Sequence, residues 1–202
     1  MSAAAAGGGG GAMDGRFGPQ GAPVSATSAP GGGGGAMDGR FGLYLDVGRC
    51  VGCEACVVAC MDQNDLEPER KEHAWRRVFA LASEGAVAFV SLACMHCGDA
   101  PCILGCPTGA LGLDGATGAV TVDGGRCIGC HSCSMACPFG VPRYGNDGRM
   151  QKCDLCATRV ERGLDPACVH TCPTRALRFG PVNDLTVDLQ ARAAARLARP
   201  GG

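Results

Sequence analysis

The feature that most constrains this chain is its cysteine content: 16 cysteines among 202 residues, all of them between Cys50 and Cys172. Aromatic side chains, by contrast, are limited to one Trp, two Tyr and six Phe. Such a cysteine density is typical of disulfide scaffolds and of metal proteins, because both replace missing hydrophobic burial with covalent cross-links. The first question is therefore which of the two classes this chain belongs to.

The cysteines fall into four groups of four. The first and third groups share the spacing C-x2-C-x2-C-x3-C, whereas the second and fourth have wider middle gaps. In chain order the groups are Cys50, Cys53, Cys56 and Cys60; Cys94, Cys97, Cys102 and Cys106; Cys127, Cys130, Cys133 and Cys137; and Cys153, Cys156, Cys168 and Cys172. A zinc site usually joins two C-x2-C pairs that lie a dozen or more residues apart. Only the fourth group fits that alternative.

The spacing of the first and third groups predicts iron–sulfur clusters. Three closely spaced thiolates wrap three irons of one cubane, and a fourth cysteine three residues later, usually before a proline, ligates a second cluster. Pro107, Pro138 and Pro173 follow three of the groups, and Met61 follows the first. Gly52 and Gly129 suit a backbone that wraps closely around inorganic sulfide. Sixteen thiolates make four [4Fe-4S] clusters with none left over, so we expect all sixteen to be ligands and no residue to be catalytic.

Cluster loading would change the charge balance of the chain. The formal net charge is -1, and each oxidised cubane with four thiolates adds about -2, which brings the total to roughly -9. Basic residues close to the ligands in sequence would stabilise an added electron; the alternative is that each is a solvated surface charge. These residues are Arg49, Arg126, Arg143, Arg149, Lys152, Arg159 and Arg175.

His96 and His131 lie inside cysteine groups, and we expect them to be loop residues near the clusters rather than ligands.

Outside the cysteine groups, short apolar runs predict a few regular elements. Residues 75–81 and 86–92 flank a Ser-Glu-Gly turn and indicate a β-hairpin, while 41–47 and 118–122 indicate short strands. Residues 185–199 carry Leu185, Leu189, Ala193 and Leu197 at helical spacing. The predicted fold class is therefore α+β.

The first 40 residues are rich in Gly, Ala, Ser and Pro, a composition that cannot offset the entropy of ordering, so we expect a disordered tail. The sequence GGGGGAMDGRFG occurs twice, at 7–18 and 31–42, which suggests a recent duplication. We expect the functional protein to begin near Met13 or Met37.

No run of about 18 apolar residues predicts a membrane span, and no leader segment or twin-arginine pair opens the chain.

The sequence resembles the four-cluster iron–sulfur subunits of molybdopterin oxidoreductases, in particular that of the dimethyl sulfoxide reductase type. The resemblance covers residues 41 to about 185 and rests on the stretches RCVGCEACVVAC, CMHCGDAPCILGCPTGA, RCIGCHSCSMACPFGVPRY, KCDLC and CVHTCPTRALRFGP. Some relatives replace one ligand of the third group and hold a three-iron cluster. Here Cys133 and the other ligands are present, so four cubanes are expected.

The resemblance implies interleaved ligand sets, in which three cysteines of one group share a cluster with the last cysteine of a partner group. Four sets result: set A (Cys50, Cys53, Cys56, Cys172), set B (Cys60, Cys153, Cys156, Cys168), set C (Cys94, Cys97, Cys102, Cys137) and set D (Cys106, Cys127, Cys130, Cys133).

This pairing implies two nested modules like the two-cluster bacterial ferredoxins. The inner module would span 94–137. The outer module would combine 41–93, including the hairpin insertion, with 138–182, and 183–202 would form a C-terminal helix and tail.

The same resemblance implies a function as an electron relay between a molybdopterin catalytic subunit and a quinone-linked, integral-membrane anchor, with no binding of nucleic acid. The chain would then be peripheral to the membrane through its partner, either on the cytoplasmic side or exported with the catalytic subunit. Alternatives with the same chemistry are a subunit of a formate dehydrogenase or hydrogenase-linked complex and a soluble polyferredoxin. A zinc-stabilised interaction module is the alternative from another class.

Overall fold

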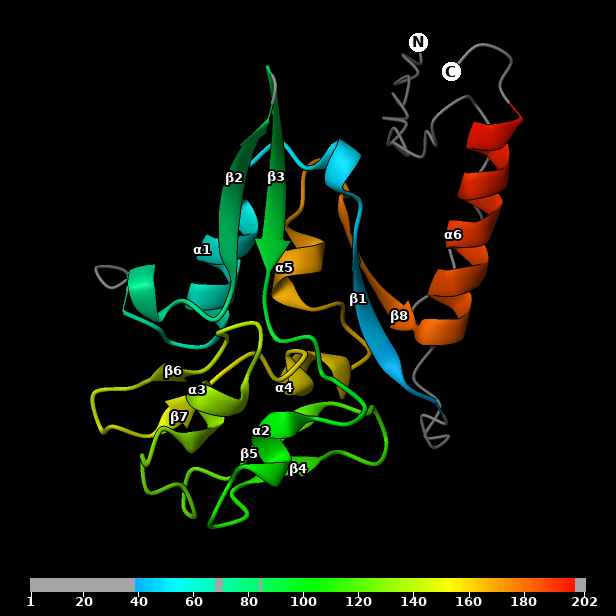
Figure 1. Ribbon diagram of the computed structural model, residues 1–202. Helices are drawn as coiled ribbons and strands as arrows, with labels where there is room; N and C mark the ends of the chain where they lie inside the picture. The colour runs from blue at the N-terminus through cyan, green and yellow to red at the C-terminus, as the bar shows by residue number, and fades with distance from the viewer. Residues whose placement is uncertain (1–38, 68–70, 84, 199–202) are drawn as a thin grey trace, which may run out of the picture.

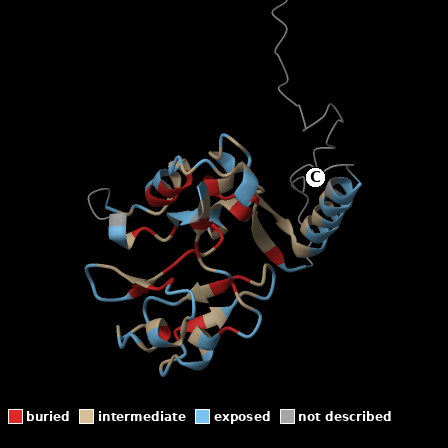
Figure 2. Cartoon of the chain, turned by 45° about the horizontal axis from the view of Figure 1, so that its top comes forward, coloured by how far each residue is buried: buried red, intermediate tan, exposed pale blue. Residues whose placement is uncertain are grey.

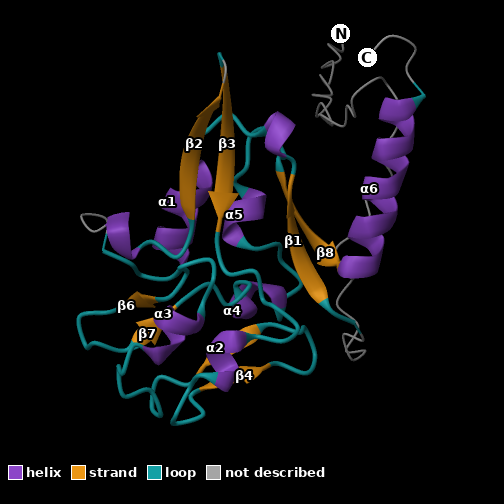
Figure 3. Cartoon of the chain, in the orientation of Figure 1, coloured by secondary structure: helices purple, strands orange, loops and turns teal. Residues whose placement is uncertain are grey.

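The computed structural model describes residues 39–67, 71–83 and 85–198. The duplicated segment, the expected starts at Met13 and Met37, and nearly all of the expected tail at 1–40 lie outside these residues. The described part mixes short helices with two-stranded antiparallel sheets joined by long loops (Figure 3), in agreement with the α+β class.

The strands pair as β1 with β8, β2 with β3, β4 with β5 and β6 with β7. Their bounds are β1 Phe41–Leu45, β2 Arg77–Ser83, β3 Ala86–Leu92, β4 Leu111–Leu113, β5 Val120–Val122, β6 Arg143–Tyr144, β7 Met150–Gln151 and β8 Leu177–Pro181. The helices are α1 Ala55–Gln63, α2 Pro101–Leu104, α3 Ser132–Ala136, α4 Ala157–Val160, α5 Ala167–His170 and α6 Val182–Leu197. Short 3-10 turns occupy Val47–Arg49 and Lys71–His73.

The predicted hairpin is confirmed, with Arg77 opposite Leu92 and Ser83 opposite Ala86. The predicted strand at 41–47 ends at Leu45, because the chain turns into the 3-10 segment that leads to Cys50. The predicted C-terminal helix begins at Val182, three residues earlier than its apolar spacing indicated. Asp184 lies in its first turn, where an acidic side chain is favourable.

The elements separate into two halves (Figure 1). One half contains α1, α5 and the β2–β3 hairpin, and the other contains α2, α3 and β4 to β7, with α4 between them. The first half buries a cluster made of Cys56, Val57, Met61, Ala74, Cys168 and Leu177. The second half buries a cluster made of Ala100, Leu111, Val120, Cys133 and Met150. The hairpin 143–151, which the predicted boundaries assign to the outer module, packs on the second cluster through Tyr144 and Met150.

The segments before the first cysteine group and after the last one come together through the β1–β8 sheet. Phe41 lies opposite Pro181 and Leu45 opposite Leu177, so the strand before the first cysteine group is paired along its length with the strand after the fourth. The rings of Phe41 and Phe179 stack with centroids 5.4 Å apart. The segments that carry the first and last cysteine groups are thereby held side by side.

Five of the helices begin inside a cysteine group, and four of these carry the third cysteine of their group. The third cysteine of each group lies within the first two residues of its helix: Cys56 in α1, Cys102 in α2, Cys133 in α3 and Cys168 in α5. Backbone N–H groups are unpaired in a first helical turn and favour negative charge. The third cysteine of each group therefore lies at the positive end of a short helix.

Helix α6 covers the outer side of the β1–β8 sheet through its N-terminal half (Figure 1). Leu185 approaches the backbone at Gly42 and Gly180, whereas Leu197, at the other end of the helix, is 88% exposed. Exposed residues dominate the last turns of the helix (Figure 2). No helix in the described part of the chain has both the length and the apolar character needed to cross a bilayer.

A salt bridge anchors α6 to the rest of the molecule. Arg192 Nη1 lies 3.3 Å from Asp46 Oδ2, a carboxylate that is buried just after β1. Arg192 Nε also lies 3.1 Å from Asp188, which pairs in turn with Arg178 on β8. Loss of the contact to Asp46 is expected to be costly, because it would leave a buried charge without its partner.

We predict that Arg192→Ala loosens α6 by leaving the Asp46 carboxylate buried without its cation. Amide hydrogen exchange across α6 should become about tenfold faster, equivalent to about 1.4 kcal/mol. The control is Arg149→Ala, which removes a 3.9 Å pair with Asp147 from a side chain that is 50% exposed, and it should leave exchange in α6 unchanged. Equal exchange rates in α6 for Arg192→Ala and the wild type would contradict the assignment.

Candidate functional site

All sixteen cysteines are described, and all sixteen are free thiols. This excludes a disulfide scaffold in the described structure. Their exposure differs by position: Cys53 and Cys130 are exposed, whereas six are buried, namely Cys56, Cys60, Cys133, Cys153, Cys156 and Cys168. Four of these buried thiols are the complete membership of set B.

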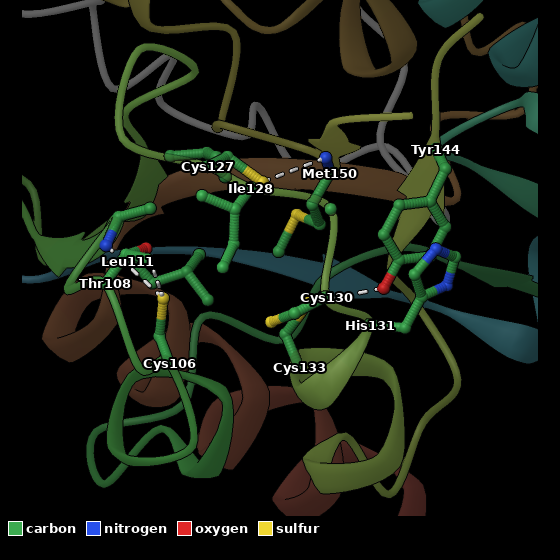
Figure 4. A pocket seen from close by; sticks show the side chains of 13 residues that line it. Cys106, Thr108, Leu111, Cys127, Ile128, Cys130, His131, Cys133, Tyr144 and Met150 are labelled. Atoms are coloured by element: carbon green, nitrogen blue, oxygen red, sulfur yellow. Dashed lines mark hydrogen bonds between the residues drawn. The ribbon is translucent and has the colours of Figure 1, made fainter. Parts of the chain in front are cut away.

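One pocket in the second half of the molecule collects the four thiols of set D (Figure 4). Cys127, Cys130 and Cys133 line it from the third group, and Cys106 lines it from the second. Leu111, Val122, Ile128 and Met150 supply apolar walls, and Tyr144 closes one side. Two chain segments that the sequence separates by some twenty residues therefore present their thiols to one space.

A second pocket, in the other half, collects the four thiols of set A. Cys50, Cys53 and Cys56 line it together with Cys172, the last cysteine of the chain. Leu45 and Leu177, which face each other across the β1–β8 sheet, form part of its wall. The pairing of the two chain ends is thus what brings Cys172 to the first cysteine group.

The thiols of sets B and C also lie close enough to interact. Burial raises the pKa of Cys60, and the nearby thiolates of Cys153, Cys168 and Cys156 raise it further. In the other half, burial together with the thiolates of Cys94 and Cys137 raises the pKa of Cys102. Each of these neighbourhoods joins cysteines of two different groups.

A left-handed residue occurs at the same place in every cysteine group, immediately before the second cysteine. It is Gly52 (φ +70°), His96 (φ +45°), Gly129 (φ +67°) and Leu155 (φ +61°). Because two of the four are not glycine, the conformation alone does not require glycine. A Cβ at Gly52 would lie 2.4 Å from the Phe89 ring, and one at Gly129 would lie 2.5 Å from the carbonyl oxygen of Gly148. Protein atoms packed against the loops therefore explain these two glycines.

Cys106 and Cys172 are the last cysteines of the second and fourth groups, and they complete sets D and A. Their surroundings are alike. Each is followed by Pro-Thr, and the threonine hydroxyl lies near the thiol: Thr108 at 3.6 Å and Thr174 at 3.7 Å. Burial alone would raise the pKa of Cys106, but hydrogen bonds from the Thr108 hydroxyl and from backbone amides lower it to about 7. Backbone amides and the Thr174 hydroxyl likewise outweigh burial and lower the pKa of Cys172. Both sites favour a thiolate.

Other hydrogen-bond donors also point at the sulfur atoms. The backbone N–H groups of Ala110, Met150 and His96 donate to Cys106, Cys127 and Cys94 at 3.3, 3.4 and 3.4 Å. The Tyr144 hydroxyl lies 3.4 Å from Cys133 Sγ and 2.7 Å from the Ser134 hydroxyl. Donors to thiolate sulfur are a feature by which proteins adjust the potential of an iron–sulfur centre.

The spread of the thiols bears on the choice between a single ion and a cluster. A tetrahedral zinc site needs four sulfurs at about 2.3 Å from one ion, hence within about 4 Å of one another. Within residues 39–67, 71–83 and 85–198, no three Cys, His, Asp or Glu side chains converge in that way around one ion. Four free thiols that line one pocket, with N–H groups directed at the sulfurs, fit a larger four-iron group.

The basic residues near the ligands are mostly not buried. Arg126, Arg149 and Arg175 are exposed, while Arg49, Arg143 and Arg159 are intermediate. Lys152 is the exception and is 4% exposed. The structure adds a second buried cation, Arg76, at 3% exposure. Sequence reasoning missed Arg76 because it lies sixteen residues from the nearest cysteine, and only the fold of the hairpin brings it to the thiols.

The two histidines inside cysteine groups have partners of their own. His96 is buried, and its Nδ1 accepts a hydrogen bond from the Val120 backbone N–H at 2.9 Å. Burial, aided by the charges of Lys152, Arg40 and Arg76, lowers the pKa of His96 to about 3, so the ring is neutral. The ring of His131 stacks on that of Tyr144 with centroids 3.8 Å apart.

Comparison with known proteins agrees with this geometry. Residues 86–182 match the 4Fe-4S dicluster domain family. The chain is 41% identical over 155 residues to the B subunit of the anaerobic dimethyl sulfoxide reductase of Escherichia coli, covering 70% of this chain and 74% of that protein. It is 47% identical over 146 residues to the thiosulfate reductase electron transfer subunit PhsB of Salmonella typhi, covering 69% and 74%. It is 35% identical over 173 residues to the iron-sulfur subunit of the nitrate-inducible formate dehydrogenase of E. coli, covering 77% and 59%.

We predict that Gly129→Ala damages the set D pocket more than Gly140→Ala does. Both glycines have a left-handed backbone (φ +67° and +57°), so alanine costs about 1–2 kcal/mol at either position. At Gly129 the new Cβ must also displace the Gly148 carbonyl, and with it the turn that directs the Met150 N–H at Cys127, whereas nothing lies within 4 Å at Gly140. The thermal midpoint and the visible absorbance per chain measure the difference. Equal losses in the two variants would contradict the steric explanation.

Proposed function

The chain belongs to the family of 4Fe-4S electron-transfer subunits that includes the B subunit of anaerobic dimethyl sulfoxide reductase and the thiosulfate reductase electron transfer subunit, and we propose that it relays single electrons through four [4Fe-4S] clusters. Such a cluster, when bound, accepts and returns one electron at a time. The chain's own residues supply the thiolates, hold them at fixed positions and surround them with apolar walls and N–H donors.

One observation carries this proposal: each of the two pockets is lined by three cysteines of one group and the last cysteine of another. That is the interleaved arrangement expected of ferredoxin-type ligands. Cys106 and Cys172, which complete sets D and A, have matching surroundings. This similarity supports the proposal that each of the two pockets holds a cluster. The buried thiols of Cys60, Cys153, Cys156 and Cys168 are proposed to form set B, and the partly buried thiols near Cys94 are proposed to form set C.

We propose two nested ferredoxin-like modules. The β1–β8 pairing and the buried cluster of the first half support an outer module made of the two ends of the chain. The buried cluster of the second half supports an inner module around sets C and D, and the packing of Tyr144 and Met150 on it extends that module to about residue 151.

The neighbouring thiols suggest a linear order of centres, from A through B and C to D. Cys56 of set A has Cys168 of set B among its electrostatic neighbours, and Cys153 of set B has Cys94 of set C among its own. Sets C and D meet at α2, which carries Cys102 and is followed by Cys106. The exposed cysteines, Cys53 and Cys130, belong to sets A and D. Electrons would therefore enter at one of these two sets and leave at the other.

The partners we propose are a molybdopterin-containing catalytic subunit and a quinone-linked membrane anchor, which would place the chain at the membrane through its partner. Relatives named as reductase subunits and electron transfer subunits support such an assembly. The similarity to the iron-sulfur subunit of a formate dehydrogenase supports the alternative, a subunit of a formate dehydrogenase complex. The identity of the proteins that co-purify with the chain separates these assemblies.

The metal content of the anaerobically purified chain tests the proposal. We expect about sixteen iron atoms and about sixteen acid-labile sulfides per chain, because four cubanes contain four of each. A colourless protein that holds zinc instead of iron would overturn the proposal and support the zinc-stabilised interaction module.

A pair of serine variants tests the interleaved ligand sets. Cys102 and Cys106 are four residues apart, yet they are assigned to sets C and D. We predict that Cys106→Ser and Cys130→Ser disturb the same cluster, while Cys102→Ser converts or removes a different one and leaves the other three. Low-temperature EPR of the reduced protein distinguishes the centres. If Cys102→Ser and Cys106→Ser change the same signal, the assignment is wrong.

A further inference from the structure

Two basic side chains are buried in the described part of the chain, Arg76 and Lys152. Neither forms a salt bridge with a carboxylate of any described residue, although Arg192, Arg178 and Arg149 all do. A buried charge without an opposite charge is strongly unfavourable, and proteins pair or neutralise such groups. Among the described residues, the negative charge that balances these two cations therefore comes from groups other than aspartate or glutamate.

Arg76 lies between the thiols of sets A and B. Its Nη1 donates to the Ser91 hydroxyl at 3.0 Å and reaches the Ser91 carbonyl at 3.5 Å. The Ser91 hydroxyl in turn lies 3.4 Å from Cys56 Sγ, a member of set A. Burial disfavours the charged guanidinium, yet the nearby thiolates of Cys168, Cys153, Cys56 and Cys60 raise the pKa of Arg76. Three of those four thiols belong to set B.

Lys152 has the corresponding position between sets B and C. Its Nζ donates to the carbonyl oxygens of Val120, on β5, and of Cys153. Cys94 and Cys102, both members of set C, are among its electrostatic neighbours. Cys153, the next residue in the chain, belongs to set B.

We propose that Arg76 and Lys152 are the internal counter-cations of the proposed clusters, and that each raises the reduction potential of the two centres between which it lies. The inference rests on the proposed function, since the balancing negative charge is that of the thiolates and of the group they hold. A cubane with four thiolates carries about -2 before reduction. Each added electron makes this charge more negative, and a buried cation stabilises it where solvent cannot screen the interaction.

This assignment explains why both cations are buried at junctions. A positive charge shared by two neighbouring centres stabilises an electron on either of them, so it raises both potentials together. The two cations together cover the A–B and B–C junctions. Set B, whose four thiols are all buried, has a cation on both sides.

The test is EPR-monitored redox titration of the full chain, purified anaerobically with the proteins that accompany it. Arg76→Gln should make one-electron reduction of the centres of sets A and B at least tenfold less favourable, a lowering of midpoint potential by about 59 mV or more. Lys152→Met should lower the potentials of sets B and C instead. In both variants the remaining centres should titrate as in the wild type, and the cysteine variants identify each signal.

Three control variants separate the charge from a structural role. Arg76→Lys keeps the charge, so its potentials should lie close to those of the wild type. Ser91→Ala removes only the hydroxyl between Arg76 and Cys56, so it should lower the potential of set A alone, by less than tenfold in the reduction constant. Arg162→Gln removes one positive charge from an exposed position, and it should shift no centre because solvent screens it.

The outcomes are distinct. If Arg76→Gln fails to hold the centres of sets A and B while Arg76→Lys holds them at wild-type potentials, the positive charge is required and the proposal is supported. If both variants lose these centres, or if Arg76→Gln titrates like the wild type, the proposal is overturned. A wild-type protein without iron and sulfide would instead overturn the proposed function itself.

Discussion

The convergence of thiols from distant segments on common pockets is the constraint on which the rest of this structure depends. The chain has few aromatic residues, and its regular elements are short, so hydrophobic burial alone offers a small core. Cysteines make up part of that core: Cys56 and Cys168 belong to the buried cluster of one half, and Cys133 to that of the other. The pairing of β1 with β8 follows from the same constraint, because it brings Cys172 to the first cysteine group.

A core that contains thiolates concentrates negative charge. Helix starts, hydrogen-bond donors and buried cations offset that charge. Third cysteines lie in first helical turns, where backbone N–H groups are unpaired. Threonine hydroxyls and backbone amides hold the pKa of Cys106 and of Cys172 below the usual value for a thiol. Arg76 and Lys152 bring full positive charges into the interior. The salt bridges of Arg149 and Arg192 belong to a different class, since their partners are carboxylates.

Local pattern predicted much of the fold and of the candidate site. The β2–β3 hairpin was predictable because two apolar runs of strand length flank a short polar turn, and the C-terminal helix because its leucines recur at helical spacing. The element bounds were less predictable: α6 begins at Val182, directly after Pro181, and β1 stops at Leu45. Arg76 was not predictable at all, since no cysteine is near it in sequence and its burial depends on how the hairpin packs. The hairpin 143–151 packs with the inner half for the same kind of reason, because Tyr144 and Met150 find apolar partners there.

The order and spacing of the residues were enough to indicate the chemistry: four groups of cysteines whose spacing suits iron–sulfur clusters. This is local information, since a few consecutive residues decide the geometry of a ligand loop. The tertiary structure decided which fourth cysteine reaches which pocket, why Gly52 and Gly129 have no room for a side chain, and where positive charge is buried. Those features depend on contacts between residues far apart in the chain, such as Gly52 with Phe89 or Lys152 with Val120, and no spacing rule along the sequence encodes them.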